Sequence, residues 1–183
     1  MRQGLPLAYP GMKIGLFGGS FDPAHEGHAH VAETALKRLG LDRVWWLVTP
    51  QNPLKPQSSP FAKRFQSAEA MAHGGDMIVT DLEQRLGLAY TYQTLRALKR
   101  RYPGVRFTLI VGADTLASFR KWRHWREVAQ SVPVAVVSRP GTSPAERLNA
   151  PKHWLFLSAR HHPQSSTAIR ARRRRTVAKA ARK

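Results

Sequence analysis

The sequence predicts a single α/β domain in which a doubly wound parallel sheet is covered by helices on both faces. Three observations support this prediction. Short apolar runs alternate with segments of helical periodicity along the chain, a pattern typical of parallel α/β sheets. The 183 residues are 42% hydrophobic, which is enough for one core. No internal repeat and no second composition regime divides the chain.

The first strand and helix are predicted within residues 13–39. Residues 13–17 (KIGLF) form a mostly apolar run that ends at two glycines, as a buried parallel strand does before a phosphate-facing turn. Apolar residues at helical spacing follow over 27–39, and Gly40 ends them. Residues 1–12 lack the long apolar core of a secretory signal, and we interpret them as an N-terminal extension.

The remaining elements continue the alternation. Further strands are predicted at 43–48, 77–80, 106–111, 132–137 and 154–157, and helices at 61–72, at 91–101 and around the WRHW sequence of 122–125. Residues 49–60 are rich in proline and are predicted to be a loop, and the tail from Thr167 onward is predicted to be helical. Ligands of such sheets bind beyond the carboxyl ends of the strands. We therefore expect residues from several loops to meet in one cleft.

The charge of the chain favours anionic partners. Thirty Lys and Arg against eleven Asp and Glu give a formal net charge of +19, which suggests nucleotides, nucleic acid or a membrane surface. From Arg170 to Lys183, eight of the fourteen residues are basic and none is acidic, and subtracting these eight charges from +19 leaves +11 on residues 1–169. The chain has no cysteine and no apolar run near the ~20 residues of a membrane span. We expect a cytoplasmic protein with no membrane partner.

Two histidines stand where the first predicted strand is followed by a helix. Within residues 15–32 (GLFGGSFDPAHEGHAHVA), His25 and His28 are three positions apart. The preceding glycines let the backbone approach an anion, and the start of the helix presents N–H groups and a positive dipole end to it. Imidazoles at this place can donate hydrogen bonds to phosphate oxygens, which matters most where negative charge develops in a transition state.

A metal site and an ordinary pair of helix histidines are the alternatives. Zinc needs three or four ligands, whereas the chain has no cysteine and only Asp22 and Glu26 as nearby carboxylates. A P-loop is excluded because no G-x-x-x-x-G-K-[ST] occurs, and Gly15, Gly18 and Gly19 do not satisfy G-x-G-x-x-G. This argues against a dinucleotide cofactor held in the usual way.

Residues 19–28 (GSFDPAHEGH) resemble the G-x-F-D-P-x-H-x-G-H signature of the nucleotidyltransferase superfamily. The second signature of that superfamily, S-S-T-x-I-R, is matched by residues 165–170. The resemblance implies a Rossmann-like fold and histidines that bind ATP. It implies a domain over 13–171, and residues 172–183 are then a basic C-terminal tail.

Three further segments resemble the bacterial nicotinate-nucleotide adenylyltransferases: WWLVTPQNPLK at 45–55, AYTYQTL at 89–95 and IVGADTLASFRKWRHW at 110–125. Phosphopantetheine adenylyltransferases usually carry Thr at the position of His25 and lack the Trp-x-x-Trp segment. The resemblance implies transfer of the adenylyl group of ATP to nicotinate mononucleotide, with release of pyrophosphate and with Mg²⁺ accompanying the ATP.

The resemblance also implies roles for particular residues. Catalysis is expected from His25, His28 and Arg170, with Arg170 on the leaving pyrophosphate. ATP is expected to bind at Gly18, Gly19, Ser20, Phe21, Ser166 and Thr167. The mononucleotide is expected to bind at Lys55, Tyr90, Thr91, Asp114, Trp122 and Arg139.

Several of these residues have structural alternatives. Trp122 can stack on a pyridine ring at low entropic cost or simply pack, and packing is the interpretation for Trp125. Thr91 can offer donors to a carboxylate and also be the N-cap of its helix. Asp114 can contact the mononucleotide or cap the following helix, and Lys55 can be a solvated lysine. Arginine, as at position 139, suits bidentate contacts to phosphate.

Two other functions remain open from the sequence. One is an adenylyltransferase for phosphopantetheine or nicotinamide mononucleotide. The other is a nucleic-acid-binding protein, suggested by the net charge and the RARRRR run of 170–175, which is unusual beside the family. The tail has no aromatic stacking platform, so nucleic acid is not the expected partner. The oligomeric state is open, with a homo-oligomer as one alternative.

Overall fold

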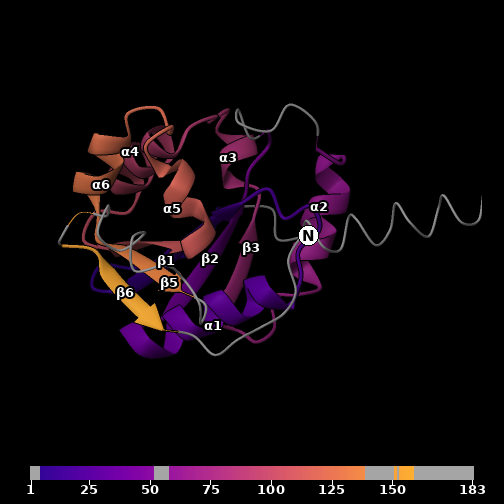
Figure 1. Ribbon diagram of the computed structural model, residues 1–183, viewed down its shortest axis with the longest axis horizontal. Coiled ribbons are helices and arrows are strands. Elements are labelled where there is room, and N and C mark those ends of the chain that lie inside the picture. Colours follow the sequence, from indigo (N-terminus) through magenta and orange to yellow (C-terminus); the bar gives the residue numbers. More distant parts are fainter. Residues whose placement is uncertain (1–4, 52–57, 139–150, 152, 159–183) are drawn as a thin grey trace, which may run out of the picture.

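The computed structural model describes residues 5–51, 58–138, 151 and 153–158, whose six strands form one all-parallel sheet (Figure 1). The strands are β1 (Lys13–Gly19), β2 (Arg43–Val48), β3 (Met77–Thr80), β4 (Arg106–Gly112), β5 (Val134–Ser138) and β6 (Leu155–Ser158). Their spatial order is β3-β2-β1-β4-β5-β6. This is the order of a doubly wound, Rossmann-like sheet with its switch point between β1 and β4, which confirms the predicted fold class.

Helices cover both faces of this sheet. They are α1 (Glu26–Leu39), α2 (Phe61–Glu69), α3 (Leu82–Arg85), α4 (Thr91–Arg101), α5 (Ala113–Phe119) and α6 (Trp125–Ser131). Because side chains alternate along a strand, β2 sends Trp45 into the core shared with α3 to α6 and Trp46 into the core shared with α1 and α2. Figure 1 shows α1 and α2 apart from the group formed by α4, α5 and α6.

The sequence predicted the bounds of β2, β3 and α4 as the structure has them, and several other bounds were wrong by a few residues. β1 continues to Gly19, α1 begins at Glu26, and β4 includes Gly112. The predicted helix 61–72 ends at Glu69, where Ala70 begins a turn. The short helix α3 was not predicted.

The last two described strands begin later than predicted. β5 begins at Val134 instead of residue 132, since Pro133 has no N–H to donate to the sheet. β6 begins at Leu155 instead of residue 154, because the N–H of Trp154 bonds to the carbonyl of Pro151 in a turn.

The helical region predicted around WRHW is present as two helices, α5 and α6, but it is interrupted within WRHW itself. Residues 120–124 form a turn between α5 and α6. The N–H of Trp122 bonds to the carbonyl of Phe119, and the N–H of Trp125 bonds to that of Trp122. His124 has the left-handed φ of 54°, which an α-helix does not allow. Trp122 and its neighbour Arg123 therefore lie on a turn that can face the sheet edge.

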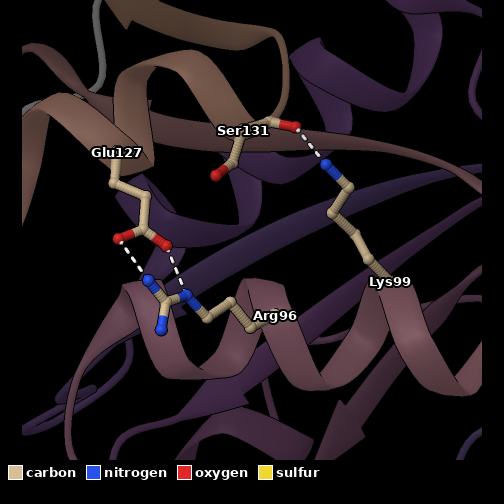
Figure 2. A network of polar contacts seen from close by, with 4 residues as sticks. All are labelled: Arg96, Lys99, Glu127 and Ser131. Carbon is tan, nitrogen blue, oxygen red and sulfur yellow. Dashed lines mark hydrogen bonds and ion pairs between the residues drawn. The ribbon is translucent and has the colours of Figure 1, made fainter.

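Polar contacts at the surface join helices α4 and α6 (Figure 2). The Nε and Nη2 of Arg96 donate to the two carboxylate oxygens of Glu127 at 2.5 and 2.9 Å. The ammonium of Lys99 donates to the carbonyl of Ser131 at 3.0 Å. Exposed pairs of this kind stabilise the fold little, but a two-point contact defines how the two helices lie side by side.

The predicted N-terminal extension packs on the domain as far as it is described. Leu5 lies against the core shared with α3 to α6. The hydroxyl of Tyr102 donates to the carbonyl of Pro6 at 2.7 Å, and Arg43 donates to the carbonyl of Leu7 at 2.9 Å. The tail 172–183 is outside the described residues. No described helix is both long and apolar enough to cross a bilayer.

Candidate active site

A cavity of about 460 Å³ opens at the carboxyl edge of the central strands. It is lined by Gly18, Gly19, Leu47, Thr49, Glu83, Ala89, Tyr90, Thr91, Leu109, Ile110, Lys121, Trp122 and Arg123. These residues come from β1, β4 and the end of β2, from α3, from the start of α4 and from the turn between α5 and α6. The cavity thus lies at the switch point of the sheet, where the sequence placed the cleft. Gly18, Gly19, Tyr90, Thr91 and Trp122 were all predicted site residues.

The two glycines that end β1 serve different purposes. A Cβ at Gly18 would meet no atom within 4 Å, so the backbone there faces open space of the cavity. A Cβ at Gly19 would come within 3.0 Å of the ring of Phe21. Phe21 has a φ of 47° and is 2% exposed. Gly19 therefore leaves room for the Phe21 ring, which folds back over the strand in a tight turn. Gly18 leaves room for a ligand to approach the backbone.

The histidine pair forms the cap of α1. His25 is the N-cap residue, and its Nδ1 accepts the N–H of Gly27 at 3.1 Å. The N–H of His25 in turn donates to Nδ1 of His28 at 3.3 Å. An imidazole whose Nδ1 accepts a hydrogen bond carries its proton on Nε2 when neutral. This cap therefore assigns an Nε2–H donor to each ring, and the ring centroids lie 3.9 Å apart.

The two histidines differ in exposure. His25 is 4% exposed, whereas His28 is half-buried. The ring of His28 packs against Phe21 at 5.1 Å between centroids, and Phe21 packs against Trp46 at 5.2 Å. The aromatic core of β2 thus fixes the orientation of His28. Neither histidine lines the cavity, and both lie at the start of α1, which follows its glycine wall.

Arg64 of α2 is a buried residue that the sequence analysis missed. Its guanidinium donates to the carbonyls of Ser20, Thr49, Pro50 and Ser59 at 2.6 to 2.9 Å, and the residue is 2% exposed. Burial lowers the pKa of Arg64, and the nearby carboxylate of Asp22 opposes this effect. One side chain therefore holds the loop after β1 against the loop after β2. Ser20, a predicted ATP-binding residue, is buried and contributes its carbonyl to this arrangement.

Glu83 is a second residue that the sequence did not single out. It lines the cavity from α3 and is 7% exposed. Its carboxyl accepts a hydrogen bond from the hydroxyl of Thr94 at 2.8 Å and another from Thr49. Burial raises the pKa of Glu83 above its ordinary value, although these two hydrogen bonds act in the opposite direction.

The start of α4 differs from its predicted capping. Tyr90 is the N-cap residue and Thr91 is the first residue inside the helix, so the interpretation of Thr91 as the N-cap was wrong. The side chain of Gln93 accepts the N–H of Tyr90 at 3.2 Å, which is why the cap falls at Tyr90. The N–H groups of Gln93 and Thr94 bond to the carbonyl of Tyr90. The backbone N–H groups of Thr91 and Tyr92 precede these and have no acceptor within the helix.

The turn after α5 forms the opposite wall. Trp122 packs on Phe119 at 4.9 Å between ring centroids and still lines the cavity, so it both packs and faces a ligand site. Trp125 packs against the core, as predicted. Asp114 is exposed in the first turn of α5 and is not among the cavity residues. Gly112 is the N-cap of α5, without a side-chain cap, so Asp114 does not cap it.

The other predicted site residues fall outside the described part of the chain. They are Lys55, Arg139, Ser166, Thr167 and Arg170. Within the described ranges, no three His, Cys, Asp or Glu side chains gather as the ligands of a metal ion would.

The missed residues share a physical cause. Arg64 and Glu83 are charged residues in polar sequences, FAKRFQ and DLEQRL, which are typical of solvated helix faces. Arg64 is buried by contacts with loops fourteen to forty-four positions away. Glu83 is buried against Thr94 of α4, eleven positions away. The only available signal was the position of Glu83 three residues after a predicted strand, at the sheet edge that binds ligands.

Comparisons with known proteins show the family of this chain. Residues 16–172 match the family model described as cytidylyltransferase-like. The "Probable nicotinate-nucleotide adenylyltransferase" of Caulobacter sp. (strain K31) is 54% identical over 168 residues, covering 87% of this chain and 85% of the relative. The protein of the same name from Roseobacter denitrificans is 48% identical over 196 residues, covering 94% of this chain and 98% of the relative.

Solved structures share the fold. Plasmodium falciparum nicotinic acid mononucleotide adenylyltransferase complexed with NaAD gives a TM-score of 0.72 at 18% identity. The same protein complexed with APC gives 0.69 at 17% identity. Each comparison covers 87% of this chain and 83% of the other.

Proposed function

The chain belongs to the cytidylyltransferase-like family, and on this premise we propose that it transfers the adenylyl group of ATP to nicotinate mononucleotide. The products are nicotinate adenine dinucleotide and pyrophosphate, a step of NAD biosynthesis. The similarity to two proteins named nicotinate-nucleotide adenylyltransferase along nearly their whole length supports this acceptor. We also propose that the enzyme is cytoplasmic.

One observation carries the proposal. The open backbone at Gly18 forms one end of a cavity whose other end is formed by Tyr90, Thr91 and Trp122, and the capped histidine pair begins the helix that follows this glycine end without lining the cavity. The first end offers donors suited to phosphates, and the second offers an aromatic ring and free N–H groups suited to a flat anionic ring. A reaction that joins two nucleotides through their phosphates requires both ends in one site.

The proposed step is an in-line displacement. The phosphate of nicotinate mononucleotide attacks the α-phosphorus of ATP, forming the new P–O bond as the bond to pyrophosphate breaks. The attacking phosphate is already anionic, so no general base is required, and catalysis consists of alignment and charge stabilisation. His28 is the more accessible donor and would bind the transferring phosphate through Nε2. His25 would act in the same way while it holds the helix cap.

Part of this mechanism is assigned to residues outside the described ranges. Arg170, with Ser166 and Thr167, would hold the leaving pyrophosphate, and Arg139 and Lys55 would bind the mononucleotide. Mg²⁺ would accompany ATP and be held mainly by phosphate oxygens and water, as is usual for this ion. Asp22 and Glu26 supply the carboxylate oxygens nearest in sequence to the histidines, and oxygen is the ligand type that Mg²⁺ prefers.

The test is pyrophosphate release with ATP and Mg²⁺ and three acceptors offered separately: nicotinate mononucleotide, nicotinamide mononucleotide and 4′-phosphopantetheine. We expect a clear preference for the nicotinate. A preference for phosphopantetheine would overturn the assignment of the cavity end at Tyr90 and Trp122. Release with none of the three would contradict the proposed reaction.

A further inference from the structure

The turn between α5 and α6 holds a guanidinium at the cavity. Arg123 lines the cavity, and its Cζ lies over the ring of Tyr90 at 5.0 Å from the ring centroid. The next residue, His124, packs its ring against Tyr92 at 4.5 Å. Two consecutive residues of the turn therefore rest on the first residues of α4. This pairing fixes Arg123 next to the start of that helix.

Contacts between α4 and α6 support the same arrangement. The Arg96–Glu127 and Lys99–Ser131 contacts of Figure 2 join the two helices that carry Tyr90 and the end of the turn. These contacts define where the end of the turn that carries Arg123 lies relative to the start of α4, and the Arg123 residue itself is exposed.

The charges in the cavity wall favour an anion at this place. Lys121 and Arg123 are its cationic residues within the described part of the chain, and Glu83 is its acid. Burial raises the pKa of Glu83 above its ordinary value. Arg123 forms no ion pair with any described carboxylate. A guanidinium that lies on an aromatic face keeps its in-plane N–H donors available for a planar carboxylate.

We propose that Arg123 determines the choice between acid and amide, because its guanidinium binds the ring carboxylate of nicotinate mononucleotide. This inference rests on the proposed function and adds a specificity-determining side chain to it. The amide of nicotinamide mononucleotide has nearly the same shape but no negative charge. It therefore forms a weaker hydrogen bond to the guanidinium than the carboxylate does. Lys121 also lines the cavity, but no contact places it on Tyr90.

The test is the ratio of kcat/KM for nicotinate mononucleotide to kcat/KM for nicotinamide mononucleotide, measured on the full chain with ATP and Mg²⁺. Arg123→Gln keeps much of the side-chain length and removes the charge. We expect the ratio to fall by about 10- to 100-fold, the range of one hydrogen bond to a charged partner. Arg123→Lys should retain part of the ratio, because a lysine keeps the charge but not the planar fork.

Two matched variants serve as controls. Arg126 also lies over an aromatic ring, that of Trp125 at 4.8 Å, and does not line the cavity, so Arg126→Gln should keep the ratio. Lys121→Gln removes the other cationic charge and should change the ratio much less than Arg123→Gln does.

Three results would overturn the inference: an unchanged ratio in Arg123→Gln, an equal loss for both acceptors, or a larger fall in Lys121→Gln. An equal loss would mean that Arg123 only supports the cavity wall. Failure of the unsubstituted protein to use nicotinate mononucleotide would instead contradict the proposed function itself.

Discussion

The two ends of the cavity are built by different means. At the phosphate end, the loop after β1 is fixed by buried contacts: the His25 cap, the Phe21 ring and the four carbonyls bound by Arg64. At the acceptor end, α4 and the turn 120–124 are held by exposed ion pairs and ring contacts. On the proposed function, the common chemistry belongs to the loop held by buried contacts, and the choice of acceptor belongs to the elements held at the surface.

The largest effect is expected from removing the phosphate donor of the first end. His28→Ala should lower kcat by about 10²- to 10³-fold, because loss of one such donor removes stabilisation specific to the transition state. The fold should persist, which unfolding curves can show. His30, two positions further along the same helix and half-buried, supplies the control: His30→Ala should keep kcat. Near-normal turnover in a folded His28→Ala protein would contradict the role of this residue.

Arg64→Met should destabilise the phosphate end as a whole. The substitution leaves four carbonyls without their donor, and each unsatisfied buried group has a substantial cost. We expect the free energy of unfolding to fall by about 2–4 kcal/mol, measured by urea unfolding. Arg38→Met at an exposed position of α1 is the matched control and should change stability little. An equal effect in both variants would mean that the hydrogen bonds of Arg64 do not organise these loops.

Glu83 should make stability depend on pH in a defined direction. Since burial raises the pKa of Glu83, the folded protein binds this proton more tightly than the unfolded chain. The contribution of this proton to the free energy of unfolding is therefore fully present below the pKa of about 4.3 that the carboxyl has in the unfolded chain. It is lost as pH rises through the pKa of the folded protein. Glu83→Gln removes this titration, so the variant should gain stability relative to the original protein between about pH 5 and pH 8.

Urea unfolding of both proteins at these two pH values measures the difference. Glu69→Gln, at an exposed carboxyl that ends α2, should show no comparable change between the two pH values. If the gain in free energy of unfolding from Glu83→Gln became smaller as pH rises, a raised pKa for this carboxyl would be contradicted.

The smallest effect is expected at the surface of the acceptor end. Glu127→Gln weakens the pair with Arg96 (Figure 2) and should leave stability nearly unchanged, because both side chains are partly solvated. It should raise KM for the mononucleotide modestly, and less than Arg123→Gln does, with kcat retained. An unaltered KM would mean that α6 does not help to position the turn 120–124.

The same contrast explains what the sequence could predict. Much of the phosphate end depends on residues close together in the chain, so the motif GSFDPAHEGH, the alternating strands and the helix start near Gly27 were predictable, whereas its contacts with Arg64 were not. The start of α4 was predictable for the same reason, apart from its N-cap at Tyr90. The Rossmann-like fold follows from these local patterns and is confirmed by the strand order.

The acceptor end depends on contacts between distant segments. The break of the WRHW region into a turn could not be predicted, because its apolar spacing also suits a helix and no glycine marks the left-handed position of His124. The place of Arg123 on Tyr90 follows only once α4 and that turn are packed together. The burial of Arg64 and Glu83 likewise results from tertiary contacts that polar local sequences do not indicate.

The separate roles of the phosphate end and the acceptor end are tested most directly in His28→Ala, by the ratio of its rates with the two mononucleotide acceptors. Pyrophosphate release should be measured with nicotinate mononucleotide and with nicotinamide mononucleotide, for the original protein and the variant. If the phosphate end acts on a chemistry common to both acceptors, both rates fall by the same large factor and their ratio is kept. A ratio that shifts as strongly as in Arg123→Gln would contradict the separation of the two ends.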